Sequence, residues 1–324
     1  MITVLGEALL DLVADADGAR FDAHLGGSPA NVAVGLARLG VPTSLASQLA
    51  DDLPGRLITD RLRRDGVALR ALPARSAQTG LAFAATDERG IATYDFRLAW
   101  DITQAAELAP GCQCLHTGSL AAMLAPGADV VERQITELRR QGQILISYDP
   151  NLRPSLMGPR DAAQARVERL VGQADIVKAS VDDLDWLYPG VPFQQAARRW
   201  LAGGPALIVI TLGERGGYGL SHAAEVTRPT VRVAVADTIG AGDAFTAALL
   251  HWLRRADLLD RSRRDALASL GADALADAMN AANLAAAMTC ERHGADPPTW
   301  SQITARPAWR RGPATGPDPP RGAE

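Results

Sequence analysis

Short apolar runs alternate with longer amphipathic segments from the start of the chain to about residue 293. The apolar runs predict strands at 2–5, 9–13, 43–49, 115–118, 144–148, 176–178 and 206–211. The amphipathic segments predict helices at 29–39, 54–65, 128–141, 160–172, 181–187, 193–201, 244–255 and 276–293. Because strands and helices of these lengths alternate, we expect an α/β fold with a parallel sheet that helices cover on both faces.

Residues 79–97 depart from this rhythm. Two strand-like runs, 79–86 and 91–97, flank the four turn-forming residues 87–90 and predict a β-hairpin. Since the hairpin stands alone among α/β units, we expect it to leave the main sheet and form a small β-lid. Residues 9–26 and 78–100 would supply most of this lid.

A glycine-rich turn joins a predicted strand to a predicted helix late in the chain. The strand is expected at 230–235, and the turn Gly240-Ala241-Gly242-Asp243 leads into the helix 244–255. Such a turn can present backbone N–H groups to an anion at a helix N-terminus. The carboxylate of Asp243 on the first turn could then reach whatever reacts with the anion, an arrangement that fits phosphoryl transfer.

Composition narrows the class of protein. The 324 residues are 47% hydrophobic and 22% charged, which is ordinary for a globular protein, and the formal charge of −4 gives no reason to expect nucleic acid or a membrane as partner. No apolar run reaches the roughly 18 residues of a membrane span, and because no basic region precedes the first apolar run, we expect no secretory signal. The three cysteines have no metal or redox spacing, so we expect reduced thiols and a cytoplasmic protein.

Two common nucleotide-binding motifs are missing from the sequence. There is no Gly-x-x-x-x-Gly-Lys-[Ser/Thr] P-loop, and the glycines of 213–219 have neither the spacing nor the position of a dinucleotide fingerprint. None of the five histidines has metal-ligand spacing, and none is given a role. Phosphates must therefore be held at other helix N-termini, with 240–242 as the leading candidate.

Two segments at opposite ends of the chain resemble the signatures of one family. Gly26-Gly27-Ser28-Pro29-Ala30-Asn31 opens a predicted helix, with Ser28 at the N-cap and Pro29 at the first position. Together with 237–245, it resembles the ribokinase-type sugar kinases, which include ribokinase, fructokinase and the minor phosphofructokinase. The likeness covers roughly residues 1 to 300.

The resemblance implies a Rossmann-like (ribokinase-like) three-layer α/β/α sandwich with a β-lid. Residues 1–305 would form this kinase domain. The segment 306–324, rich in Pro, Gly and Arg, is expected to be a disordered tail. The opening 6–12 looks like that of bacterial fructokinases, and 149–154 is similar to fructokinases and 2-keto-3-deoxygluconate kinases.

The resemblance also implies roles for the turn. Asp243 would be the general base that takes the proton of the sugar hydroxyl. In the turn Gly240-Ala241-Gly242-Asp243, the N–H groups of Ala241, Gly242 and Asp243 would form the anion hole for the transferred phosphoryl group. Asp237 and Thr238 match a loop where the family binds a monovalent cation such as K⁺; a plain turn at the end of a strand is the alternative for these two.

The sugar side would lie near the first signature. Asp11 would bind two sugar hydroxyls, Gly26 and Gly27 would let the sugar approach the backbone, and Asn31 would offer a donor and an acceptor. First-turn capping remains the alternative for Asn31. Arg97 on the lid could cover the sugar, or could simply be a solvated charge.

Other positions correspond to the phosphate and metal side of the family. Asn151 is placed with the substrate, and both Arg153 and Lys178 could contact a phosphate. Ser180 and Asp183 match the family's Asn-x-x-Glu motif, with both residue types changed. Since aspartate is one methylene shorter than glutamate, Mg²⁺ would be reached through water.

The nucleotide would lie against a third group of residues. Thr211, Gly213 and Gly216 resemble the loop beside the ATP phosphates and ribose. Asn283 corresponds to an adenine-side position, with burial as a packed, hydrogen-bonded helix residue as the alternative.

The expected function is transfer of the γ-phosphoryl group of ATP to a primary hydroxyl of a ketose, with Mg²⁺ as cofactor. Fructose is the first choice of substrate and 2-keto-3-deoxygluconate the second; a nucleoside kinase and a non-catalytic sugar- or nucleotide-binding regulator are further alternatives. Lid-to-lid pairing of exposed sheet edges favours a homodimer.

Overall fold

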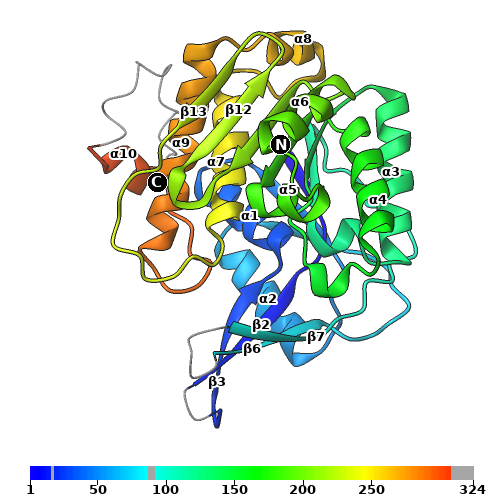
Figure 1. Cartoon of the computed structure of the whole chain (residues 1–324). Coiled ribbons are helices and arrows are strands. Elements are labelled where there is room, and N and C mark those ends of the chain that lie inside the picture. The colour runs from blue at the N-terminus through cyan, green and yellow to red at the C-terminus, as the bar shows by residue number, and fades with distance from the viewer. Residues whose placement is uncertain (16–17, 87–91, 308–324) are drawn as a thin grey trace.

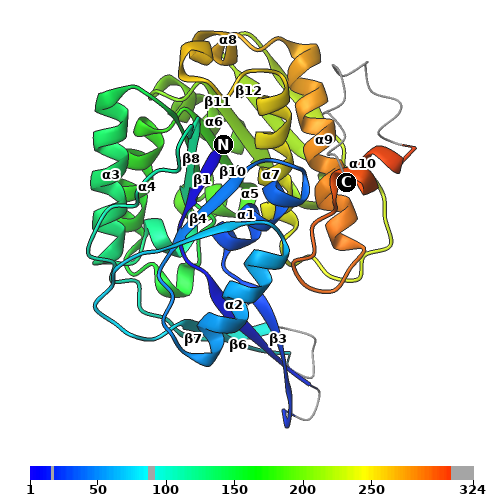
Figure 2. The same ribbon diagram turned by 180° about the vertical axis from the view of Figure 1, so that it is seen from behind.

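The computed structural model describes residues 1–15, 18–86 and 92–307. The hairpin turn predicted at 87–90 and the tail from residue 308 onward lie outside these residues. Within them the chain forms a large α/β body from which a smaller sheet projects (Figures 1 and 2). None of the helices in this part of the chain is long and apolar enough to cross a membrane.

The strands fall into two sheets. They are β1 (Ile2–Leu5), β2 (Leu9–Ala14), β3 (Phe21–Gly26), β4 (Thr43–Ser47), β5 (Ala68–Ala71), β6 (Gly80–Thr86), β7 (Ala92–Arg97), β8 (Cys114–Gly118), β9 (Leu145–Asp149), β10 (Ile176–Ser180), β11 (Leu207–Thr211), β12 (Gly217–Ser221) and β13 (Glu225–Arg228). The main sheet has the order β13-β12-β11-β10-β9-β8-β1-β4-β5, and the small sheet has the order β3-β2-β6-β7.

The helices follow the predicted pattern closely. They are α1 (Ser28–Arg38), α2 (Leu53–Arg64), α3 (Gly127–Gln141), α4 (Arg160–Gln173), α5 (Val181–Leu187), α6 (Phe193–Ala202), α7 (Ala241–Arg255), α8 (Arg264–Ala268), α9 (Ala272–Cys290) and α10 (Trp300–Ala305). Short 3₁₀ turns lie at Ser119–Ala122, Pro154–Leu156, Gly213–Arg215 and Arg261–Arg263. Each predicted helix is present, with ends shifted by a few residues.

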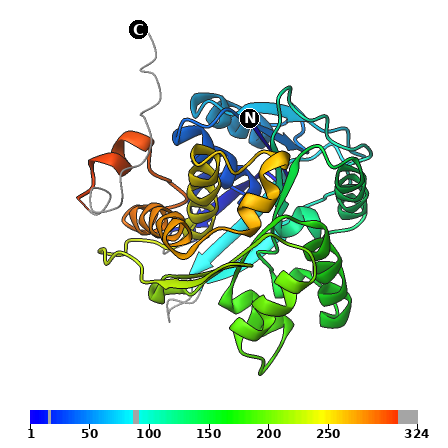
Figure 3. The same cartoon turned by 90° about the horizontal axis from the view of Figure 1, so that it is seen from above.

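Helices cover both faces of the main sheet (Figure 3). The reason is visible in β9 and β11, where successive side chains enter opposite cores: Leu145 and Leu207 pack with α1, α7 and α9, whereas Ile146 and Ile208 pack with α3, α4 and α6. Strands buried on both faces are typical of parallel sheets, because the crossover helices occupy both sides. The three-layer α/β/α sandwich is therefore confirmed.

Two details of the predicted main sheet were wrong. The sheet is mixed, because β12 and β13 form an antiparallel edge beyond the parallel strands. The strand predicted at 230–235 is absent: the chain there pairs with no neighbour among the described residues, and Val235 is 63% exposed. Its β-branched residues suit an extended backbone, but β13 at 225–228 already forms the sheet edge, so 230–235 has no ladder to join.

The small sheet is built as a lid would require. β6 and β7 pair antiparallel, as the hairpin prediction expected, and β2 joins them by pairing parallel with β6 and antiparallel with β3. This sheet projects from the end of the body where β1 runs through residues 6–8 into β2 (Figure 1). It therefore stands beside the carboxyl ends of the parallel strands, where ligand sites of α/β sheets form.

Candidate active site

Asp243 lies at the point where the two ends of the chain meet. It occupies the first turn of α7 and is 7% exposed. Its Oδ1 accepts a hydrogen bond of 2.6 Å from Ser28 Oγ, and its Oδ2 accepts one of 2.9 Å from Asn31 Nδ2. Both donors come from the start of α1, so the first family-like segment holds the carboxylate of the second.

The predicted N-cap at Ser28 was wrong. The cap position of α1 is Gly27, whose φ of 92° suits glycine, and it makes no side-chain cap bond. Ser28 is instead the first helical residue, and its hydroxyl donates a hydrogen bond to Asp243. First-turn capping was the alternative for Asn31. Its side-chain amide does not cap its own helix but donates to Asp243.

Burial raises the pKa of Asp243, while the hydrogen bonds from Ser28 and Asn31 and the charges of Lys178 and Arg153 lower it. The two direct donors are neutral, so they orient the carboxylate without neutralising it. A carboxylate in this state is oriented and still able to accept a proton. This is what general-base chemistry needs.

The turn before Asp243 packs tightly on a second loop. Gly240, the N-cap of α7, has φ of 76°, and a Cβ there would lie 2.6 Å from Cβ of Ala295. Asp237 accepts from the amide of Ile239 at 3.0 Å and from the amide of Gly294 at 2.8 Å. These bonds fit the plain-turn alternative for Asp237, and each carboxylate oxygen still keeps a lone pair for a cation.

The first turn of α7 offers its amides to an anion. Helix N-termini leave N–H groups without intrahelical acceptors. Ala241 N already donates to the carbonyl of Thr238 at 3.3 Å, which leaves the amides of Gly242 and Asp243 as the better donors of the predicted trio. A Cβ on Gly242 would lie 3.2 Å from Nζ of Lys178, so this helix end and the only lysine of the chain face the same space.

Lys178 forms a buried ion pair with Asp149. Its Nζ donates to Asp149 Oδ2 at 2.9 Å, and the two side chains are 6% and 1% exposed. Burial raises the pKa of Asp149 to about 6, and Lys178 acts against that rise. Asp149 Oδ1 has no hydrogen-bond partner in the described part of the chain, so this carboxylate has one buried oxygen to spare.

The sugar-side residues lie on the neighbouring loops. Asp11 stands over Gly26, where a Cβ would lie 2.3 Å from its Oδ2, and a Cβ on Gly27 would lie 2.5 Å from the carbonyl of Glu7. Burial raises the pKa of Asp11 to about 6, with Arg153 lowering it and Asp243 raising it further. The charges of Asp11 and Asp243 therefore interact, as expected of two groups that line one site.

Asn151, Arg153, Ser180 and Asp183 form one bonded unit at the ends of β9 and β10. Arg153 Nη1 donates to Asn151 Oδ1 at 2.7 Å. Ser180 and Asp183 form the capping box of α5, and Asp183 Oδ1 also accepts from the amide of Leu152 at 2.7 Å. Since both oxygens of Asp183 are engaged, a metal reached through water fits better than direct ligation. In the described ranges no three His, Cys, Asp or Glu side chains are grouped to hold a metal directly.

The predicted nucleotide side follows β11. Thr211 ends this strand, and Gly213 and Gly216 have φ of 61° and 95° in the turn behind it. Asn283 is 2% exposed, and its Nδ2 donates to the carbonyls of Arg228 and Pro229 at 3.1 and 3.3 Å. This bonding fits the structural alternative for Asn283, whose contact with adenine stays a prediction. Arg97 is exposed and pairs with Asp95 at 2.9 Å, as a solvated lid charge would.

Comparison with known proteins decides the family. A sequence model described as pfkB family carbohydrate kinase matches residues 1–302. The chain belongs to this family. A fructokinase of Rhizobium leguminosarum bv. trifolii is 32% identical over 283 residues, covering 85% of both chains, and one of Klebsiella pneumoniae is 32% identical over 297 residues, covering 89% of this chain and 91% of that one.

Solved structures agree with the pfkB assignment. A fructokinase of Vibrio cholerae O395, in a fructose-, ADP- and calcium-bound form, superimposes with a TM-score of 0.76 at 27% identity over 94% of this chain and 97% of that one. A sugar kinase of Pyrococcus horikoshii gives a TM-score of 0.75 at 28% identity, covering 96% and 99%. The ribokinase-like fold and a carbohydrate kinase with fructokinase relatives are thus confirmed.

Sequence reasoning missed two buried carboxylates of this pfkB kinase. Asp149 was recognised only as part of the motif around Asn151 and Arg153, although a charged residue that ends an apolar strand is a signal in itself. Glu7 follows β1, is 2% exposed, and accepts from the amide of Ala121 at 2.9 Å. Burial raises the pKa of Glu7 to about 7, against hydrogen bonds from Ser119 and Ala121. The signal was the same in both cases: an acid at, or two residues after, the end of a buried strand.

Proposed function

We propose that this pfkB-family kinase transfers the γ-phosphoryl group of ATP to the primary hydroxyl of fructose, yielding fructose 6-phosphate and ADP. The position of Asp243 carries this proposal: its carboxylate is buried, oriented by two neutral donors, and set at a helix N-terminus opposite Asp11. The fructokinases among its relatives, including one bound to fructose and ADP, favour fructose over other sugars.

In the proposed reaction, Asp11 and the backbone at Gly26 and Gly27 bind the sugar. Asp243 accepts the proton of the primary hydroxyl while the hydroxyl oxygen attacks the γ-phosphorus. The bond from that phosphorus to the bridging oxygen breaks, and ADP takes the electron pair. The raised pKa of Asp243 brings its basicity closer to neutrality, where proton transfer is most effective.

Charge on the transferred group would be met from two sides. The N-terminal amides of α7 at Gly242 provide one set of donors, and Lys178 Nζ faces the same space. Arg153 lies near enough to lower the pKa of Asp11 and of Asp243, so it faces this cluster as well. Thr211, Gly213 and Gly216 would support the ATP phosphates beyond it.

The residues at the ends of β9 and β10 fit Mg²⁺. Asp149 has an unpartnered buried oxygen, and Asp183 lies close enough to raise its pKa. Hard oxygen ligands of this kind suit a magnesium ion that keeps several waters. Asp149 and Asp183 would hold the ion through water, and the ion would screen the charge of the ATP phosphates. Asp237 and Thr238 would hold a monovalent cation such as K⁺ beside the turn.

Three further features belong to the proposal. The β-lid would close over the sugar and exclude water, which would otherwise accept the phosphoryl group. Two lids would pair in a homodimer, since Phe21 on the edge strand β3 is 47% exposed. The enzyme would work in the cytoplasm.

A coupled ADP-release assay tests the substrate. Fructose, 2-keto-3-deoxygluconate, ribose, tagatose and adenosine are compared at equal concentration with saturating ATP and Mg²⁺. We expect the highest kcat/KM for fructose. A higher value for any other acceptor would refute the choice of fructose, and turnover of none of them would refute the activity.

A further inference from the structure

A cavity of about 390 Å³ lies behind the loop that supports the anion-hole turn. Its walls come from the lid strands β2 and β3, from α1 and α2, and from the loop 293–296. The floor is apolar, with side chains such as Leu10, Val34 and Ile58. A cavity of this size lies in the range of small-molecule sites.

The rim of the cavity carries cationic and imidazole groups. Arg61, Arg64, His24 and His293 line it, and Asp296 is its only acid. Arg64, His24 and His293 are exposed, and in ranges 1–15, 18–86 and 92–307 they make no side-chain hydrogen bond or ion pair. The N–H groups of these three side chains are therefore available to an anion at the rim of the cavity.

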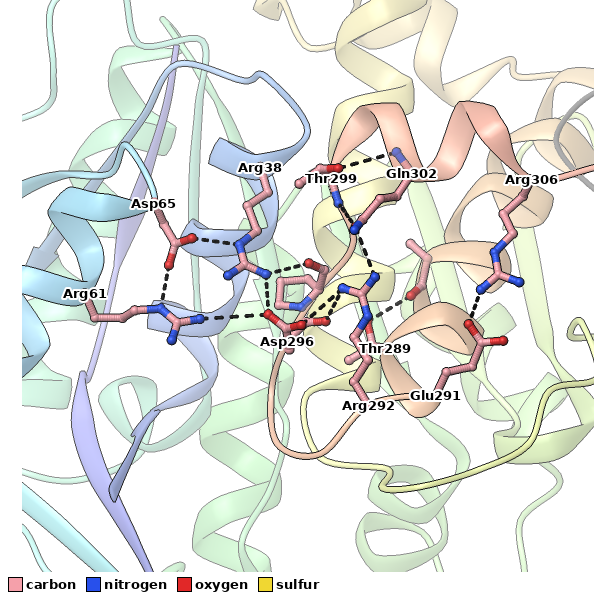
Figure 4. A network of polar contacts seen from close by, with 12 residues as sticks. Arg38, Arg61, Asp65, Thr289, Glu291, Arg292, Asp296, Thr299, Gln302 and Arg306 are labelled. Atoms are coloured by element: carbon pink, nitrogen blue, oxygen red, sulfur yellow. Dashed lines mark hydrogen bonds and ion pairs between the residues drawn. The ribbon is translucent and has the colours of Figure 1, made fainter. Parts of the chain in front are cut away.

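The acid of the rim is already engaged in an ion-pair network (Figure 4). Asp296 binds Arg38 and Arg292, and Asp65 binds Arg38 at 2.7 Å and Arg61 at 2.8 Å. Three guanidinium groups therefore face two carboxylates. Among the charged residues that line the cavity itself, Arg61 and Arg64 outnumber Asp296 by one positive charge, which favours an anionic ligand.

We propose that this cavity is a second binding site, which takes a small molecule carrying a phosphate group on an apolar carbon skeleton. Arg64, Arg61 and His293 would bind the phosphate by charge-assisted hydrogen bonds, and the apolar floor would receive the skeleton. The site is distinct from the proposed sugar site, since Asp11 is not among the residues that line the cavity, and neighbouring residues of a strand such as Leu10 and Asp11 point to opposite faces.

The loop 293–296 connects this cavity to the catalytic turn. The amide of Gly294 donates to Asp237 at 2.8 Å, and Ala295 packs against Gly240 so closely that a Cβ on Gly240 would lie 2.6 Å from Ala295 Cβ. A ligand that binds His293 and Arg64 would fix this loop against the lid strand β3. It would therefore change turnover; this coupling, unlike the binding, rests on the proposed role of the turn.

Binding is tested by calorimetry with phenyl phosphate, inorganic phosphate and phenol. The variants are Arg64→Gln/His293→Gln, the control Arg63→Gln, and Asp243→Asn. Arg63 lies on the same helix but pairs with Asp60 and does not line the cavity. We expect phenyl phosphate to bind equally well to the wild type, Arg63→Gln and Asp243→Asn. Its affinity for the double variant should be at least about tenfold lower. The wild type should bind phenyl phosphate more tightly than inorganic phosphate or phenol.

Three results would overturn the site: no binding of phenyl phosphate, equal binding by the double variant, or loss of binding in Asp243→Asn, which would place the ligand in the catalytic centre. The coupling is tested by turnover, where phenyl phosphate should change kcat at least about twofold in Arg63→Gln but not in the double variant. Equal effects on both would refute the coupling. Binding is measured without turnover, so a failure of the proposed sugar kinase activity is recognised separately.

Discussion

Buried carboxylates at the two ends of the main sheet differ in how many cations pair with them. At the amino end, Asp175 is fully buried just before β10, and one of its oxygens receives Arg139, Arg261 and Arg264 at 2.7 to 2.8 Å. Around the carboxyl ends, burial raises the pKa of four carboxylates, and few cations oppose it. These four are Glu7, Asp11, Asp149 and Asp243.

This difference in pairing indicates that the buried acid at the amino end stabilises the fold, whereas the acids at the carboxyl ends can take part in the reaction. An acid that pairs with three arginines ties α3, α8 and the turn before α8 to the sheet. Acids that burial leaves under-compensated can exchange protons and attract metal ions or sugar hydroxyls. Substitution of Asp175 should therefore alter mainly stability, whereas substitution of Asp11 or Asp243 should alter mainly activity.

The largest effect is expected from Asp243→Asn. An amide keeps the size of the side chain but cannot take the proton, so kcat should fall by at least about 10²-fold. Sugar binding should remain measurable, since Asp11 and the backbone of Gly27 are untouched. Steady-state assays with fructose and calorimetric titration of the sugar measure the two quantities. Near-normal kcat would remove Asp243 as the base.

Asp175→Asn should be the counterpart at the amino end. It leaves three guanidinium groups facing a neutral amide, and we expect a loss of about 3 kcal/mol in the free energy of unfolding, since these groups are about a quarter exposed and can be partly rehydrated. The kcat of the folded enzyme should stay within about twofold.

The matched control is Asp129→Asn, whose carboxylate is 51% exposed and paired with Arg166. It should cost no more than about 1 kcal/mol. Denaturant titrations of the three proteins give the comparison. A loss of activity in Asp175→Asn without a loss of stability would break the division between the two ends.

The sequence could predict those parts of the fold that depend on local burial. Hydrophobic periodicity predicted six of the seven parallel strands of the main sheet, all except β5, and the lid hairpin, because it reports local burial. It failed at 230–235, where β-branched residues are extended but no neighbouring strand is available. Alternation alone does not say whether a strand has a partner.

For the candidate site too, local motifs could be predicted from the sequence and long-range contacts could not. The turn at 240–243 and the segment 26–31 were recognisable because each motif is local. That Ser28 donates to Asp243, 215 residues later, depends on how α1 and α7 pack, which no local pattern contains. The ion pair of Lys178 with Asp149 was missed for the same reason, since it requires β9 and β10 to be neighbours.

A smaller effect is expected from Asp11→Ala. Loss of a charged acceptor for sugar hydroxyls should weaken fructose binding by about ten- to a hundredfold, the equivalent of one hydrogen bond to a charged group, with a smaller change in kcat. The control is Asp22→Ala, an exposed carboxylate on the neighbouring strand β3. If fructose affinity were equal in the two variants, Asp11 would not belong to the sugar site.

The smallest effect concerns Glu7 and depends on pH. Its pKa of about 7 lies above its usual 4.5, so the folded protein binds more protons than the unfolded chain between these values, and its stability falls as pH rises through this window. Glu7→Gln removes the titrating group and keeps an acceptor for the amide of Ala121. The stability of the variant relative to wild type should therefore increase between pH 5 and pH 8, by up to about 2 kcal/mol. Urea titrations across this range measure the difference, and parallel curves would show that Glu7 does not titrate there.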